Sequence, residues 1–360
     1  MIDALTKNGR FIFIPVFVLL LVISFIGGWI MRGRPSPEPI FSDDQPVHNS
    51  SENGVKVQLR LGGDTWTRPL LVCDTNPLIE SSEVQQIKNL IDNEVQKGVQ
   101  KQDIQTASVY FRNLITSEQF AVRGNEKFYP SSLRKVPLLI SVLKMAETSQ
   151  DILNNVRVAL TGEDQNGQQE IKPKEFAEVG KTYLVKDLLE KMIRYSDNNA
   201  TAALASVSGV DTIRGVFENM YVPFVGSPLT LRSENEIEGL TAYQFSFFLR
   251  VLYNATYLDH ESSSRALRLM SEVDFKEGLV SGVPGNIPVA HKFGLMTLQQ
   301  KNGPVVNRQL HDCGIVYHIK SPYVLCVMTK STAPILQIEQ FIGRLSAIVY
   351  TGVSNMNKSG

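Results

Sequence analysis

The stretch from residue 128 to residue 140 reads FYPSSLRKVPLLI. Its apolar half predicts a buried helix, and Ser132 and Lys135 stand three residues apart at the start of that helix, on one face. A serine hydroxyl is a weak nucleophile until a neighbouring base takes its proton, and burial can lower the pKa of a lysine enough for that task. The helix N-terminus adds a positive dipole end and a free Ser132 N–H for a developing oxyanion.

Taken alone, Ser132 and Lys135 also fit a helix-capping serine followed by a solvated lysine. Two later stretches of sequence favour a catalytic role for Ser132 and Lys135. The first is YSDNNAT at residues 195–201, which lies between two helical patterns and holds more polar residues than a turn and a helix cap need. The second is VAHKFG at residues 289–294, on a predicted strand, where a glycine after a basic residue allows a ligand to lie along the backbone.

The start of the folded domain predicts a helix and then a hairpin. Apolar residues recur with helical spacing over residues 84–95, and Ser82 with Gln85 forms a capping box. Two β-favouring runs follow at residues 108–114 and 118–123, and the few polar residues between them predict an antiparallel hairpin.

The rest of the domain is helical in its middle and returns to strands late. Residues 132–271 repeat apolar positions every three or four residues, which predicts helices. Strand patterns follow at residues 289–298, 313–319 and 323–329, and residues 335–350 predict a closing helix. Strands at both ends of a helical middle predict one α/β domain whose sheet is completed by distant parts of the chain.

In their order along the chain, the three polar stretches resemble the Ser-x-x-Lys, Ser-Asp-Asn and Lys-Thr-Gly set of the penicillin-recognising serine enzymes, and class A β-lactamases above all. The resemblance covers residues 82–353. It implies a β-lactamase/DD-peptidase-like fold, in which an antiparallel sheet from both chain ends is flanked by helices and joined to an all-helical subdomain.

The resemblance also implies the catalytic roles. Ser132 forms the acyl-enzyme, Lys135 activates it, and Ser196 relays a proton toward the leaving nitrogen. For deacylation, the best match to the family's Arg-x-Glu-x-x-Leu-Asn loop is RSENEIE at residues 232–238, which makes Glu234 the candidate general base. This loop departs from the family pattern and is short, and a solvated loop carboxylate is an equally good interpretation of Glu234.

Substrate binding is implied for five further residues. Asn198 would hold the side-chain amide of the substrate, and Lys292 would attract its carboxylate. Phe293, beside Gly294, replaces the hydroxyl residue of Lys-Thr-Gly, which puts the binding of ordinary penicillins in doubt. The N–H of Leu295 would complete the oxyanion hole with that of the nucleophile. A serine, a lysine and backbone donors suffice for acyl transfer, so no cofactor and no metal are expected.

An apolar run at residues 11–31 carries no charge and is long enough to cross a bilayer of ~30 Å. We interpret it as an uncleaved single-pass anchor, with a cleaved signal peptide as the alternative. Residues 1–10 are then cytoplasmic, residues 32–78 form a flexible linker and extension, and residues 79–355 form the hydrolase domain, which we expect outside the cytoplasm.

The amino-acid composition limits the classes of binding partner that we expect. Lys and Arg number 36, as do Asp and Glu, so no broad field favours nucleic acid. We expect a monomer that binds a β-lactam or a D-Ala-D-Ala peptide and contacts the membrane through its anchor. Cys313 and Cys326 flank a predicted hairpin, and two separate buried thiols are favoured over a disulfide.

Three functions fit these residues. The first is a membrane-anchored, β-lactamase-like hydrolase that works through acyl-Ser132. The second is a peptidoglycan DD-peptidase, which the anchor and the altered Glu234 loop favour. The third is an inactive sensor of β-lactams or peptidoglycan, which Phe293 and the loop changes favour.

Overall fold

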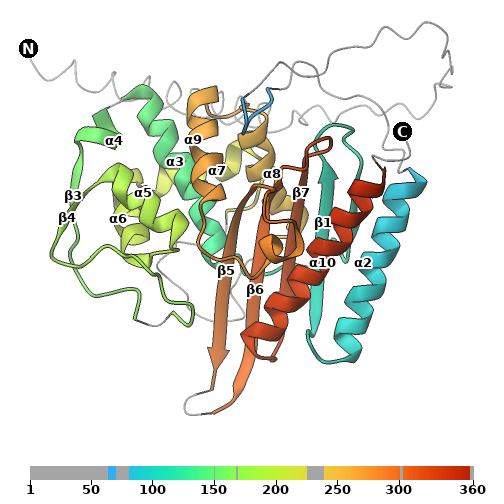
Figure 1. Ribbon diagram of the computed structural model, residues 1–360. Coiled ribbons are helices and arrows are strands. Elements are labelled where there is room, and N and C mark those ends of the chain that lie inside the picture. The colour runs from blue at the N-terminus through green and yellow to red at the C-terminus, as the bar shows by residue number, and fades with distance from the viewer. Residues whose placement is uncertain are drawn as a thin grey trace, which may run out of the picture. The chain divides into compact units, whose positions relative to one another are not determined.

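The computed structural model describes residues 64–69, 81–149, 151–167, 169–224, 239–300 and 303–356. Its main sheet is antiparallel, with the strand order β2-β1-β7-β6-β5 (Figure 1). The strands are β1 (Thr106–Asn113), β2 (Gln119–Val122), β5 (Val289–Gln299), β6 (Val305–Val316) and β7 (Tyr323–Lys330). Early strands pair with late ones, since β1 lies between β2 and β7. This confirms the prediction of one sheet built from both ends of the domain.

Helices cover the two faces of this sheet. α2 (Ser82–Gln100) and α10 (Ile335–Met356) lie in front of it in Figure 1 and pack against each other. α8 (Ala242–Tyr253) packs against β1, β6 and β7 on the opposite face. Beside β5, one of the two edge strands of the sheet, lies a part of the domain that is mainly helical.

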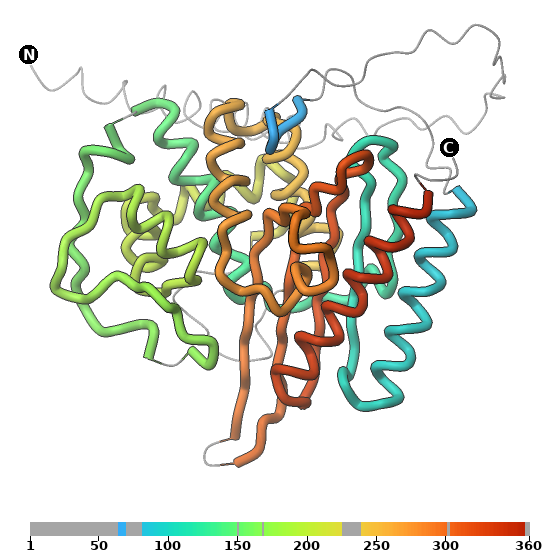
Figure 2. The backbone as a smooth tube through the Cα atoms, in the orientation of Figure 1, coloured from blue at the N-terminus to red at the C-terminus, as the bar shows by residue number. Residues whose placement is uncertain are grey.

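The helical part is built around one helix, α3 (Lys135–Thr148), which contacts α5, α6, α7 and α9. Its neighbours are α4 (Asp151–Asn155), α5 (Val185–Arg194), α6 (Asn198–Ser208), α7 (Val210–Asn219) and α9 (His260–Ser271). Apolar side chains of α3 such as Leu138, Leu139 and Val142 are buried, as the apolar stretch predicted. A small hairpin of β3 (Arg157–Ala159) and β4 (Thr182–Leu184), which periodicity did not predict, lies at the outer side of this part (Figure 2).

Two predicted boundaries were wrong. The cap of α2 is Ser81, whose hydroxyl accepts from Val84 N–H at 3.3 Å, and not Ser82. β6 begins at Val305 rather than near residue 313. The polar residues of its first half hid the strand, because their side chains are buried against loops that the local sequence does not specify.

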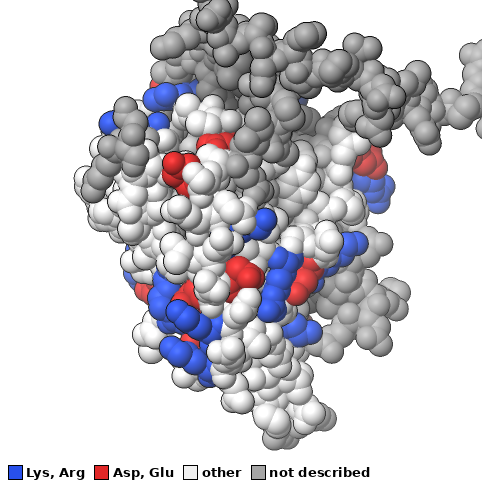
Figure 3. All heavy atoms as spheres, turned by 90° about the vertical axis from the view of Figure 1, so that its right-hand side faces the viewer, with Lys and Arg blue, Asp and Glu red and all other residues white. Residues whose placement is uncertain are grey.

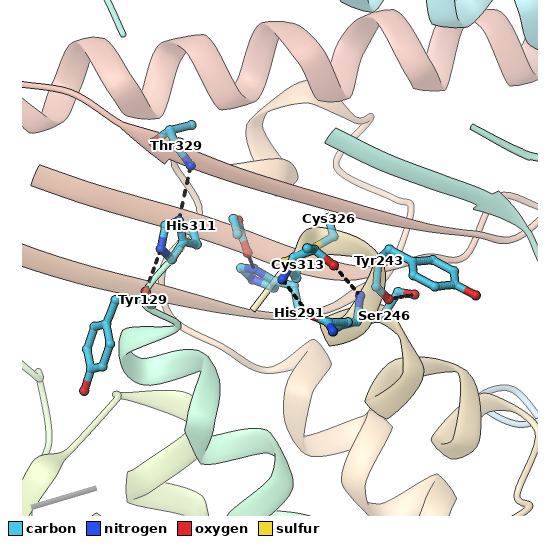
Figure 4. Close-up of a disulfide and its surroundings, with 11 residues drawn as sticks. Tyr129, Tyr243, Ser246, His291, His311, Cys313, Cys326 and Thr329 are labelled. Atoms are coloured by element: carbon cyan, nitrogen blue, oxygen red, sulfur yellow. Dashed lines mark hydrogen bonds and ion pairs between the residues drawn. A yellow bond between two sulfur atoms is a disulfide. The ribbon is translucent and has the colours of Figure 1, made fainter. Parts of the chain in front are cut away.

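The two cysteines of the sheet are joined. Cys313 on β6 lies directly opposite Cys326 on β7, and the pair forms a disulfide (Figure 4). The interpretation as two separate buried thiols was therefore wrong. Local sequence could not distinguish a disulfide from two thiols, because the two β-carbons are brought face to face only by the antiparallel register of β6 with β7.

Charges of both signs are interspersed on the face that carries α2 (Figure 3). Arg344 on α10, for example, contacts Glu94 at 2.7 Å and Asp103 at 2.9 Å. This mixture agrees with the balanced composition. In the described part of the chain, the helices lack the combination of length and apolarity that a membrane span requires. The predicted anchor, residues 11–31, lies outside the described residues.

Candidate active site

Ser132 lies in a short 3₁₀ helix, η1 (Ser131–Arg134), and α3 follows directly. Ser131 before it has a positive φ of 49°, a conformation that non-glycine residues seldom adopt. Gly294 on β5 packs against this turn: a Cβ at that position would lie only 3.0 Å from Pro130 O and Ser132 N. Glycine therefore lets the edge strand approach the backbone N–H of Ser132.

Lys135 begins α3 and is buried. Its Nζ donates to Ser196 O at 2.6 Å, to Ser196 Oγ at 3.1 Å and to Asn198 Oδ1 at 2.8 Å. Burial and the nearby charge of Lys292 lower the pKa of Lys135 well below its ordinary value. A neutral amine can take a proton, so this lysine suits a general base. Within the described residues, Ser132 Oγ has no hydrogen-bond partner, so it is not engaged by Lys135 here.

Ser196 links the two lysines of the site. Its Oγ also accepts from Lys292 Nζ at 3.0 Å, so both lysine side chains converge on one hydroxyl. Its backbone has a positive φ of 59°, which turns the chain sharply before α6. Asp197 caps α6 through its side chain, which accepts from Asn199 N–H.

Lys292 stands on β5 and is fully buried. Its Nζ also donates to Phe293 O at 3.0 Å and lies 4.0 Å from the centre of the Phe293 ring. Burial lowers the pKa of Lys292 to about 7, against the opposing effect of Asp312. The Phe293 ring stacks on Phe275 at 4.3 Å. Phe293 is thus packed beside the ammonium group that was predicted to bind a carboxylate.

The sequence model of the Beta-lactamase enzyme family matches residues 85–353, which include η1, α6 and β5. The chain belongs to this family. Among solved structures, it is similar to PBP-A, with 19% identity, 78% of this chain and 100% of that chain covered, and a TM-score of 0.62. It is also similar to a class A β-lactamase from Bacteroides cellulosilyticus DSM 14838, with 18% identity, 77% of this chain and 100% of that chain covered, and a TM-score of 0.64. A β-lactamase from Sphaerobacter thermophilus DSM 20745 has 19% identity, with 74% of this chain and 96% of that chain covered, and a TM-score of 0.60.

At these identities the solved structures show the shared fold. No curated protein matches the chain. The chain thus belongs to a family of penicillin-recognising serine hydrolases.

Some of the predicted site residues contact one another in the described part of the chain, and others do not. Lys135, Ser196, Asn198 and Lys292 are joined by hydrogen bonds, and Gly294 contacts the turn of Ser132. Leu295, the predicted oxyanion donor, follows on β5 and is partly exposed. Glu234 lies outside the described residues.

A support behind the Ser132 turn was missed by the sequence interpretation. His311 on β6 places its ring between two backbone groups: Nε2 lies 2.9 Å from Tyr129 O, and Thr329 N–H donates to Nδ1 at 3.2 Å (Figure 4). Burial lowers the pKa of His311 to about 4, so the imidazole is neutral and its Nε2–H donates to Tyr129. Gln309 Oε1 accepts from Tyr129 N–H at 3.0 Å. These side chains fix the residues that lead to η1.

A second buried histidine lies beside Lys292. His291 Nδ1 is 2.8 Å from Asp312 Oδ1, and Asp312 Oδ2 accepts from Leu279 N–H. Leu279 opens η3 (Leu279–Gly282), which packs on α10. His291 is thus part of a buried connection between the β5–β6 pair and η3.

Proposed function

We propose that the chain is a serine acyl-enzyme that opens β-lactam amides through an acyl-Ser132 intermediate. The observation that carries this proposal is the convergence of Lys135 and Lys292 on Ser196 Oγ, beside the turn that holds Ser132. One structurally similar protein, a mutant of PBP-A, was solved as an acyl-enzyme complex with penicillin G. The fold is therefore compatible with a penicilloyl group on a serine.

In the proposed acylation, neutral Lys135 accepts the proton of Ser132 Oγ as that oxygen bonds to the β-lactam carbonyl carbon. The carbon–nitrogen bond of the ring then breaks. Ser196 passes its hydroxyl proton to the departing nitrogen and takes in its place the proton that Lys135 accepted from Ser132, over the 3.1 Å between Lys135 Nζ and Ser196 Oγ. The N–H groups of Ser132 and Leu295 would stabilise the oxyanion. Charged Lys292 would attract the ligand's carboxylate.

In the proposed deacylation, Glu234 takes a proton from a water as the water oxygen bonds to the acyl carbon. The bond from that carbon to Ser132 Oγ then breaks, and the proton passes from Glu234 to Ser132 as the product leaves. The side chain of Asn198 would hold the acyl amide during both half-reactions. To do so, Asn198 must turn from Lys135 and Gln165 O, its present partners.

A time course of intact mass after penicillin addition tests this function. We expect an adduct on the wild-type chain that decays, together with turnover of a chromogenic cephalosporin, and neither in Ser132→Ala. Hydroxyl removal eliminates the bond-forming atom, so activity should fall by ~10³-fold or more. Absence of an adduct on the wild type would overturn the proposal.

A DD-peptidase is the second candidate, and the departure of residues 232–238 from the family's deacylation loop favours it. Phe293, whose ring stacks on Phe275 where the family motif has a hydroxyl, favours the sensor instead. A lasting adduct, together with cleavage of a D-Ala-D-Ala peptide, would indicate this activity. A lasting adduct without peptide cleavage would indicate the sensor.

We also propose that residues 11–31 anchor the chain in the cell membrane with the catalytic domain outside the cytoplasm. The uncharged apolar run supports this, and so does the Cys313–Cys326 disulfide, because disulfides persist in oxidising compartments. A reporter that works only outside the cytoplasm should be active when it is fused after Gly360. Activity of a cytoplasm-specific reporter at that position would contradict the assignment.

A further inference from the structure

Two arginines from different elements lie near each other on the side of the sheet away from β5. Arg112 stands on β1, which lies between β2 and β7, and Arg250 stands near the end of α8. In Figure 1 the strands β6 and β7 separate β1 from β5. Burial, and then the charge of Arg112, lower the pKa of Arg250, so the two positive charges act on each other. This pair is therefore separate from the lysines around Ser196.

A set of polar and aromatic contacts fixes Arg112 and joins the β1–β2 hairpin to α8. Gln119 Oε1 accepts from Arg112 Nη1 at 2.9 Å and from Tyr110 Oη at 2.5 Å. The Tyr110 ring packs edge-on against the ring of Tyr243 on α8, with 5.2 Å between the ring centres. The guanidinium of Arg112 is thus held at the place where the hairpin meets the helix.

Arg250 reaches the same place from α8. It follows Tyr243 by seven residues, which is about two helical turns, so both side chains lie on one face of the helix. Its guanidinium lies over the Phe247 ring, 4.9 Å from the ring centre. Burial raises the pKa of Tyr110, and the charges of Arg250 and Arg112 oppose that rise. Both arginines are partly exposed, and Tyr243 beside them is 41% exposed, so a small solute can reach the pair.

In the part of the chain that the structure describes, no carboxylate balances this pair. Neither guanidinium forms an ion pair there, and the charges that act most strongly on Arg250 belong to another arginine and two tyrosines. The carboxylate of Glu118 is engaged elsewhere, since it accepts from Ser81 N–H at 3.1 Å and from Thr116 Oγ1 at 2.8 Å. Withdrawing two like charges from water without a counterion is unfavourable. A bound anion would supply the missing negative charge.

We propose that Arg112 and Arg250 form a binding site for a phosphate group. A guanidinium presents its N–H donors in a planar fork that matches the oxygens of a phosphate. A phosphate monoester carries a charge of about −1.5 to −2 at pH 7, which balances two arginines, whereas a carboxylate balances one. Inorganic phosphate and the headgroup of a phosphate-bearing lipid share this chemistry. The inference does not depend on acylation of Ser132.

Titration calorimetry on the full chain tests the site with two probes: inorganic phosphate, and dihexanoyl phosphatidic acid, a short-chain lipid phosphate that dissolves as a monomer. Ionic strength is held constant, because salt screens exposed charges. The variants are Arg112→Met, Arg250→Met and their combination, in which methionine keeps an aliphatic stem and removes the charge. Arg344→Met is the matched control, because Arg344 also lies over a phenylalanine ring but is paired with Glu94 and Asp103.

We expect the wild type to bind phosphate, each single variant to bind about tenfold more weakly, and the double variant to bind neither probe. The control should match the wild type. Similar affinity for both probes would support the site and identify free phosphate as its ligand, and at least about tenfold tighter binding of the lipid would support it and identify a lipid headgroup. Absence of binding to the wild type would overturn the inference, as would unchanged binding to the double variant or equal weakening in the control.

Urea unfolding gives a second readout that shows whether each variant is folded. A ligand that binds only the folded chain stabilises it, so phosphate should raise the unfolding midpoint of the wild type and of Arg344→Met. The midpoint of the double variant should not change with phosphate. An equal rise in the double variant would overturn the inference. Penicillin acylation should be the same in the double variant and the wild type, because β1 and β5 lie on different sides of the sheet.

Discussion

Two buried lysines share the hydroxyl of Ser196, and this contact dominates the electrostatics of the site. Removal from water disfavours the charged form of each lysine, and the charge of Lys292 adds to this effect at Lys135. The pKa of Lys135 is lowered well below its usual range, and that of Lys292 falls to about 7. The neutral form of Lys135 is therefore easier to reach than that of an exposed lysine, and at pH 7 part of the population keeps Lys292 charged for an anionic ligand.

The lowered pKa of Lys292 predicts a pH-dependent stability. Between pH about 7 and pH 10.5, the ordinary pKa of a lysine, the unfolded chain binds more protons than the folded chain. Burial of Lys292 therefore does not lower the free energy of unfolding above pH 10.5, where the lysine is neutral in both states. It lowers that free energy progressively as the pH falls toward about 7. Relative to Lys292→Met, the free energy of unfolding of the wild type should rise by about 3 kcal/mol from pH 7 to pH 10.

Urea unfolding of both proteins across this pH range measures that difference. Lys181→Met, at an exposed position beside Glu178, is the control, and its difference from the wild type should not rise with pH. A wild-type-minus-Lys292→Met difference that stays flat would show that Lys292 is not destabilised by burial.

Still at the scale of residues, the motifs predicted which side chains meet but not how they are held. Ser196 and Lys292 could be assigned because their neighbours in sequence match a known pattern. The support of the Ser132 turn by His311 could not, because it depends on the pairing of β6 with β7. The packing of Phe293 on Phe275 likewise joins a strand to a distant loop.

At the scale of elements, the apolar periodicity predicted those helices and strands whose buried face is set by their own sequence. The apolar spacing of α3 and the hairpin of β1 and β2 are confirmed, since their core faces follow from their own sequence. The first half of β6 could not be predicted, because buried Arg308 is compensated by Glu170 and Ala333 O from remote segments. The connection between β3 and β4 escaped prediction for the same reason: Asn166 and Ala177 in it are both held by the carboxylate of Asp197.

At the scale of the whole molecule, the antiparallel sheet completes the site. β1 and β2 come from the start of the domain and β5 from near its end, yet they form one sheet with β5 at the edge beside the helical part. The pairing of early and late strands places the Lys292 edge against the turn of Ser132. This arrangement makes acylation of Ser132 the central expectation.

Mapping a penicillin adduct on the full chain tests that expectation most directly. After acid quenching, trypsin releases Ser132 in the peptide of residues 128–134 and Ser196 in the peptide of residues 195–214, so the two serines are separated by mass. We predict that the acyl mass lies on the first peptide and that fragmentation assigns it to Ser132 rather than Ser131. An adduct on the second peptide, or no adduct on either, would contradict the account.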